Sequence, residues 1–193
     1  MRKLKIFQHI TLDGVIQHSD ENGFRYGDWS SPYRSAEGRN VLLEAQGDKF
    51  DLLLGRRTYD IWADYWPKAP SGPMADGING ATKYVATHRP ESLDWGPVEA
   101  VGPNLTEDIA RIKGQEGPDL VMWGSASLAS DLLRNDLADE LLLIVYPVLL
   151  GVGKRLFDGD FIPRAFHLMS SDAFSVGTIL NRYELEGGLR TSD

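Results

Sequence analysis

The chain has 193 residues, a formal net charge of −8 at pH 7 and no cysteine. Without cysteine there can be no disulfide, thiolate metal site, iron–sulfur cluster or cysteine nucleophile. The acidic balance disfavours nucleic acid and anionic membrane as partners. No apolar run is long enough to cross a bilayer, and no signal-peptide cleavage region follows the start, so we expect a cytoplasmic protein. The histidines lie far apart in the sequence, so no metal site is expected.

Hydrophobic patterns predict strands and helices that alternate through the first two thirds of the chain, followed mostly by strands. Strands are expected at 3–9, 50–54, 82–87, 98–101, 120–123, 140–150, 166–171 and 178–186. Helices are expected at 35–46, shortly after residue 58, at 104–113 and at 128–134, with a surface segment at 67–80. The order predicts an α/β fold whose sheet is mostly parallel, with an antiparallel C-terminal edge and helices on both faces. We expect one domain over 1–187 and a flexible tail at 188–193.

Three of the expected parallel strands end in residues that suit an anion. These residues are Gly55, Arg56, Arg57 and Thr58; Thr87, His88 and Arg89; and Gly124, Ser125, Ala126 and Ser127. The carboxyl ends of parallel strands share one edge of a sheet, and helix N-termini and arginine forks both bind phosphate. Together the three turns fit one extended polyphosphate ligand, with the glycine turn on a pyrophosphate. Taken singly, each is equally a close-packed or solvated turn. The Gly-x-Gly-x-x-Gly and Walker A motifs are absent.

Two other stretches bear on a substrate. Asp13-Gly14 follows the first strand and is either a simple turn or a carboxylate held at the mouth of the sheet. The loop at 18–32 is long and carries Phe24, Tyr26 and Trp29. Such a loop forms either a lid over a planar ligand or a dimer contact.

Five motifs in this order carry a resemblance to a known family. They are Thr11-Leu12-Asp13-Gly14, Leu54-Gly55-Arg56-Arg57-Thr58-Tyr59, Thr87-His88-Arg89, Met122-Trp123-Gly124-Ser125-Ala126-Ser127-Leu128, and Tyr146-Pro147-Val148-Leu149-Leu150-Gly151 with Gly153. With them, residues 1–186 resemble the dihydrofolate reductase-like superfamily. Within it, they resemble the reductase domain of the bacterial riboflavin-biosynthesis deaminase–reductase.

This resemblance implies an NADPH-dependent reductase, often a homodimer, with a mostly parallel sheet. By the resemblance, 55–58 would hold the adenosine-side phosphates, Thr87 and Arg89 would lie by the ribose 2′-phosphate and adenine, and 124–127 would hold the pyrophosphate. The reference reaction reduces the ribose of 5-amino-6-(5-phosphoribosylamino)uracil. True dihydrofolate reductases carry an acidic residue near the position of Arg39, so folate reduction is not expected here. The absence of cysteine excludes the zinc deaminase activity.

The resulting hypothesis is hydride transfer from NADPH to a small polar C=O or C=N compound that is pyrimidine-like or pterin-like. Asp13 is the first candidate for a proton donor or substrate-orienting carboxylate, and Glu44 is the second. The residues expected to border the substrate are Asp13, Gly14, Tyr26, Trp29, Arg39 and Trp62. The alternative is a non-catalytic, dimeric nucleotide-binding module of the same fold.

Overall fold

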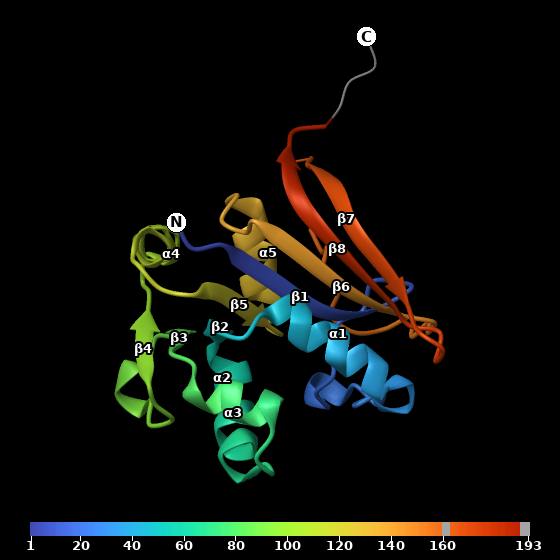
Figure 1. Ribbon diagram of the computed structural model, residues 1–193, viewed down its shortest axis with the longest axis horizontal. Helices are drawn as coiled ribbons and strands as arrows, with labels where there is room; N and C mark the ends of the chain where they lie inside the picture. Colours follow the sequence, from blue (N-terminus) through green and yellow to red (C-terminus); the bar gives the residue numbers. More distant parts are fainter. Residues whose placement is uncertain (160–162, 190–193) are drawn as a thin grey trace.

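The computed structural model describes residues 1–159 and 163–189. Within these residues the strands are β1 Leu4–Thr11, β2 Phe50–Gly55, β3 Lys83–Ala86, β4 Val98–Val101, β5 Asp119–Trp123, β6 Glu140–Tyr146, β7 Ala165–Ala173 and β8 Ile179–Gly187. The α-helices are α1 Ala36–Gln46, α2 Arg56–Tyr65, α3 Pro73–Gly80, α4 Leu105–Gly114 and α5 Ala126–Arg134. Figure 1 shows helices on both sides of one twisted sheet, with the β7–β8 hairpin extending from one end.

The strands form one sheet in the order β4-β3-β2-β5-β1-β6-β8-β7. All neighbours from β4 to β6 are parallel, whereas β8 runs antiparallel to β6 and β7 antiparallel to β8. This confirms the predicted mostly parallel sheet with an antiparallel C-terminal edge. The carboxyl ends of the six parallel strands therefore lie on one edge, which we call the carboxyl edge.

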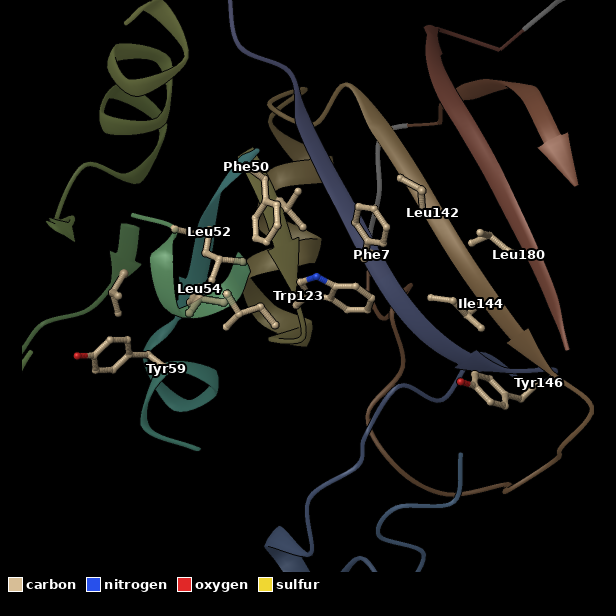
Figure 2. Close-up of a cluster of buried hydrophobic side chains, with 14 of the residues drawn as sticks. Phe7, Phe50, Leu52, Leu54, Tyr59, Trp123, Leu142, Ile144, Tyr146 and Leu180 are labelled. Atoms are coloured by element: carbon tan, nitrogen blue, oxygen red, sulfur yellow. The ribbon is translucent and has the colours of Figure 1, made fainter. Parts of the chain in front are cut away.

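Alternation along the strands creates two hydrophobic layers. On β1, Phe7 faces the side of the sheet covered by α1, α2 and α3, and Ile6 faces the side covered by α4 and α5. Figure 2 shows Phe7, Leu142 and Trp123 of the first layer. Continuous apolar strands were expected from a sheet covered on both faces, because both sets of side chains are then removed from water.

One helix was not predicted, and two expected boundaries are wrong. The segment 67–80, expected as a surface segment, is mostly exposed but contains α3, with Pro73 in its first turn and Ala75 and Ile78 buried. Its Pro and Gly residues suggested a loop and not a helix, although proline is well tolerated at a helix start. The helix expected from 128 begins at Ala126, and the strand expected to run through 150 ends before Pro147, which lacks an N–H for the ladder.

Two further features concern the described residues only. None of their helices is long and apolar enough to cross a membrane. Across 1–159 and 163–189, no group of three or more His, Asp or Glu side chains is arranged to hold a metal ion. Of the tail expected at 188–193, residues 190–193 lie outside the described residues.

Candidate active site

At the carboxyl edge, the turns that follow β2 and β5 pack directly against each other. A Cβ atom on Gly55 would lie 2.7 Å from Cβ of Ser125, and a Cβ atom on Gly124 would lie 3.0 Å from Oγ1 of Thr58. Gly124 also has φ +64°, a left-handed conformation that favours glycine. Both glycines are therefore needed for the close approach of the two turns.

This approach brings two helix N-termini to the same place. Helix α2 begins after Gly55 and α5 after Ser125, and neither has a side-chain capping hydrogen bond. The backbone N–H groups of each first turn have no partner within their own helix and carry the positive end of its dipole. Ala126 and Ser127 belong to the first turn of α5, and Ser127 is exposed. We call Gly55, Gly124 and the first turns of α2 and α5 the phosphate cradle, because paired helix N-termini of this kind are suited to an anion.

Arg56, one of the residues expected to bind phosphate, is engaged with its own chain. Its Nη1 donates to the carbonyl of Arg89 at 2.9 Å and to Oγ of Ser92 at 2.8 Å, and its Nε donates to Oδ1 of Asp60 at 2.8 Å. Because these contacts join α2 to the loop after β3, Arg56 fixes the position of that loop. Arg57 is exposed on the first turn of α2.

The loop after β3 presents Arg89 at the carboxyl edge. The backbone N–H of Arg89 donates to Oγ1 of Thr87 at 3.0 Å. The Arg89 side chain is 63% exposed, and its Nη2 lies 3.7 Å from Oδ2 of Asp60. His88 is also exposed. The described geometry therefore places an exposed guanidinium next to the α2 junction, held there through Arg56.

Asp13 is held in the turn after β1. Its carboxylate accepts hydrogen bonds from Oγ1 of Thr11 at 2.6 Å and from the backbone N–H of Gly151 at 2.8 Å. The Thr11 bond, followed by backbone bonds that include Gly151, lowers the pKa of Asp13 to about 2. Asp13 is thus ionised at neutral pH and fixes this turn to the loop after β6. Gly14 has φ +83° and packs near the Arg155 side chain.

A cavity of about 570 Å³ opens beside the carboxyl edge, on the side of the sheet covered by α1. Its walls come from α1 and the residues before it, from the segment 65–75, and from β6 and β8. Side chains that give it polar or aromatic character are His9, Tyr33, Arg34, Arg39, Trp66 and Tyr146. A space of this size and mixed lining is typical of a small-molecule site.

The rings of His9 and Tyr146 lie in the inner wall of the cavity, and that of Trp123 packs behind His9. The His9 ring lies 5.6 Å from that of Trp123 and 5.6 Å from that of Tyr146. Figure 2 shows Tyr146 at the end of β6, beside β1. Burial, with smaller effects of His18 and Arg34, lowers the pKa of His9 to about 3. Burial also raises the pKa of Tyr146 to about 12. Both side chains are neutral at physiological pH.

The residues expected at the substrate are spread over different environments. Arg39 lines the cavity. Trp29 is buried behind the cavity wall, with its ring 5.0 Å from that of Tyr146. Trp62 packs edge-on against Trp66, which does line the cavity. Tyr26 is 44% exposed and packs on the buried Phe24. The buried aromatics of the loop at 18–32 thus belong to the chain's own core.

Glu44 lies apart from this cavity. It is exposed on α1 and borders a separate hollow with Gln46 and Asp48. The sequence reasoning missed His9, Tyr33, Arg34, Trp66 and Tyr146 as lining residues. Two signals were available: His9 shares a strand face with Phe7 and Thr11 near the carboxyl end of β1, and Tyr146 ends a parallel strand.

Residues 2–180 match the RibD C-terminal domain. The chain belongs to this family. The family is reductase-related, which supports an oxidoreductase in general. Among curated proteins, the chain is 27% identical over 190 residues to the uncharacterized protein YyaP of Bacillus subtilis, covering 96% of each chain. It is 29% identical over 156 residues to the uncharacterized protein YwjB of the same organism, covering 81% of this chain and 83% of YwjB.

Solved structures share the fold. A putative riboflavin biosynthesis protein from Shewanella sp. PV-4 superposes with a TM-score of 0.69 and 22% identity, covering 95% of this chain and 99% of that one. A pyrimidine reductase-like protein from Corynebacterium diphtheriae superposes with a TM-score of 0.67 and 14% identity, covering 98% of this chain and 93% of that one. Acinetobacter baumannii RibD superposes with a TM-score of 0.63 and 18% identity, covering 96% of this chain and 58% of RibD. The dihydrofolate reductase-like fold expected from the motifs is thereby confirmed.

Proposed function

We propose that this protein is an NADPH-dependent reductase that transfers a hydride to a polar C=O or C=N group of a flat, pyrimidine-like or pterin-like substrate. The observation that supports it is the position of the cavity relative to the phosphate cradle. His9 in the cavity wall stacks near Trp123, and Trp123 directly precedes Gly124 of the cradle. A dinucleotide with its pyrophosphate on this cradle would have its far end within reach of the cavity.

In this proposal NADPH supplies the hydride, and the chain holds the cofactor and orients the substrate. Gly55, Gly124 and the first turns of α2 and α5 hold the pyrophosphate. Thr58, Arg57 and the loop 87–89 bind the adenosine side, with Arg89 on the 2′-phosphate and Arg56 keeping that loop in place. Asp13 orients the turn that borders the nicotinamide. Its ionised state suits positioning better than proton donation.

The chemistry of the cavity supports an anionic, planar substrate. Arg39 places a cationic side chain along its α1 side, Arg34 adds a second one that is ion-paired with Asp28, and Tyr33 and Trp66 supply aromatic surface. Aromatic faces suit flat rings, and arginine suits phosphate or carboxylate. The proposal therefore extends to a phosphorylated pyrimidine and to a step linked to riboflavin biosynthesis. A homodimer is proposed from the family resemblance alone, and sedimentation would test it.

The 2′-phosphate assignment is tested with Arg89→Ala. A charge-assisted hydrogen bond contributes about 1.5–3 kcal/mol, so the Kd for NADPH should rise roughly tenfold to a hundredfold while that for NADH stays within about twofold. Arg111→Ala is the matched control, because Arg111 lies in the last turn of α4, paired with Glu99 of β4. It should change neither constant. An equal loss of affinity for NADPH and NADH in Arg89→Ala would refute the assignment.

Turnover separates the enzyme from the non-catalytic alternative. The loss of NADPH absorbance is followed with pyrimidine, pterin and simple carbonyl compounds. Oxidation of NADPH that depends on the added compound, with a KM that rises in Arg39→Ala, supports the reductase. Tight NADPH binding without turnover on any of these compounds favours a nucleotide-binding module.

A further inference from the structure

Helix α3 connects the cavity with the loop that carries Arg89. Its first residues, 73–75, line the cavity. Its last turn contacts the loop 87–96, which follows β3 and which we call the adenosine loop. The residue that makes this contact is Asn79, whose side chain is half-buried. One short helix therefore borders both the proposed substrate site and the loop proposed to bind the adenosine side of the cofactor.

Both polar atoms of the Asn79 amide are engaged, one on each side. Nδ2 donates to the carbonyl oxygen of Trp66 in the cavity wall at 2.9 Å, and Oδ1 accepts from Nε1 of Trp95 in the adenosine loop at 3.2 Å. The reverse orientation of the amide would place two donors together at Trp95 and two acceptors together at Trp66, so only the observed one satisfies both contacts. A single planar group thus joins the cavity wall to the adenosine loop.

On the loop side, the anchor is Trp95, which is 8% exposed. Nζ of Lys83 lies 4.4 Å from the centroid of the Trp95 ring. The same ammonium donates to the carbonyl oxygens of Asn79 at 2.6 Å and of Gly96 at 3.2 Å, so it ties α3 to the end of the adenosine loop. Because Arg89 belongs to this loop, its placement depends on Trp95 remaining buried.

On the cavity side, Trp66 is held through its backbone. Its carbonyl oxygen accepts from Asn79 and from the N–H of Ala69 at 3.2 Å. Nε1 of its ring is buried and has no hydrogen-bond partner among the described residues, so the indole adds no polar contact. Asn79 therefore supplies the hydrogen bond that ties this part of the cavity wall to another helix.

We propose that Asn79 is a positioning residue that couples the cofactor site to the substrate cavity, so that NADPH and the substrate each bind more tightly when the other is present. This inference rests on the proposed function for the identity of the two ligands. A cofactor bound to Arg89 restrains the adenosine loop and, through Trp95 and Asn79, the carbonyl of Trp66. The ligand that binds second then loses less conformational freedom of the chain. By thermodynamic reciprocity, the gain in affinity is the same in either order.

Two substitutions break the link on opposite sides. Asn79→Asp keeps an acceptor for Trp95 but turns a carboxylate oxygen toward the Trp66 carbonyl, so the cavity side is lost. Trp95→Phe keeps a ring beside Lys83 but removes Nε1, so the loop side is lost. The Lys83 ammonium next to Asn79 offsets the new carboxylate charge, so both variants should fold. Asn135→Asp is the matched control, because Asn135 is exposed just after α5.

Hydrogen exchange without any ligand tests the link itself. The reporter is the amide of Ala69, which donates to the Trp66 carbonyl. Its exchange should become at least about twofold faster in Trp95→Phe, although that substitution lies in another loop, and also in Asn79→Asp. The amide of Leu156, after β6, should keep its rate and so exclude a global loss of stability. A wild-type rate for Ala69 in Trp95→Phe would overturn the proposal whether or not any ligand binds.

Ligand binding tests the coupling. Titration calorimetry gives the Kd for NADP⁺ with and without saturating uridine 5′-monophosphate, a flat and anionic probe of the cavity. In the wild type and in Asn135→Asp, the uridine compound should lower the Kd for NADP⁺ at least about fivefold. Asn79→Asp, Trp95→Phe and the double variant should all lose this difference to the same extent, because the two contacts act in series.

The outcomes remain separable from those of the proposed function. If the uridine compound binds but leaves the Kd for NADP⁺ unchanged in the wild type, or if both variants keep the wild-type ratio, the coupling is overturned. If it does not bind, the phosphorylated pyrimidine fails as substrate, and NADP⁺ alone decides the coupling. Slower exchange of Ala69 with NADP⁺ in the wild type, but not in Asn79→Asp, then supports it, and equal slowing in both overturns it.

Discussion

The contact between the two turns of the phosphate cradle makes Gly55 the most sensitive position of the proposed cofactor site. In Gly55→Ala, the new methyl group would lie 2.7 Å from Cβ of Ser125, closer than Cβ atoms approach one another. The Ser125 hydroxyl can rotate away, but its Cβ is fixed to the backbone, so the start of α5 must move. Overpacking of this kind costs about 1–3 kcal/mol of the free energy of unfolding.

Ser125→Gly supplies the rescue. Ser125 has φ +56°, so glycine there removes the clashing Cβ and also relieves a left-handed serine. The double variant should recover most of the stability lost in Gly55→Ala, which amounts to a coupling free energy of about 1–3 kcal/mol. Gly80→Ala is the control, because no atom lies within 4 Å of its new Cβ. It should remain within about 1 kcal/mol of the wild type.

Urea unfolding gives the stabilities, and quenching of tryptophan fluorescence gives the Kd for NADPH. We expect Gly55→Ala to raise the Kd for NADPH more than tenfold at temperatures where the variant is still folded, because the displaced N–H groups of α5 no longer converge on the pyrophosphate. Ser125→Gly should restore part of this affinity. If the two substitutions are additive in stability, or if Gly55→Ala binds NADPH as the wild type does, the reasoning about the cradle is wrong.

Three other predictions concern single groups. Asp13→Asn should lower kcat less than tenfold. It should also remove the stability that the ionised Asp13 gives the wild type above the ordinary pKa of 3.8, a contribution that the wild type loses as the pH falls toward 2, as urea midpoints will show. A loss of kcat without a loss of stability would instead make Asp13 a proton donor. Burial lowers the pKa of Lys83 in the folded protein to about 8, whereas in the unfolded chain it is near the ordinary value of 10.5. Between pH 8 and 10.5 the unfolded state therefore binds more protons than the folded state, so the stability of the wild type should rise with pH across this window. Lys83→Met should abolish this rise. Ser35→Ala removes the cap that accepts from the N–H of Gly38 and should cost about 1 kcal/mol in urea unfolding, whereas Ser127→Ala, an exposed helix position, should cost less than about 0.5 kcal/mol.

The fold could be predicted because its signals are local. Apolar runs bounded by glycine mark the strands, and alternation with helices implies the parallel order and the shared carboxyl edge. This reasoning placed 55–58, 87–89 and 124–127 on the same edge, where the structure has them. The helix within 67–80 was not predicted because the composition of this segment suggested a loop, while the burial of Ala75 and Ile78 depends on partners elsewhere in the chain.

The cavity could not be predicted in the same way. His9, Tyr33 and Tyr146 come from three distant stretches, and no spacing in the sequence records that their rings meet. Arg56 illustrates a second limit. Sequence shows that an arginine has donors, but not that the loop 33 residues later uses them.

Helix α1 forms one wall of the cavity and packs on the core through side chains that are only partly buried, Val41, Leu42 and Ala45. Ser35 caps its start, and Gln46 is its one buried residue in the described chain, where Oε1 accepts from Nε1 of Trp123 at 3.3 Å. By contrast, α5 buries Leu128, Ala129 and Leu132. Amide hydrogens of α1 should therefore exchange with solvent through local opening, and those of α5 through openings of higher free energy. A ligand that touches both α1 and the sheet adds contacts to a helix whose apolar side chains are only partly buried. Ligand binding would therefore stabilise α1 against local opening, and the affinity would be reduced by the free energy needed to order this helix.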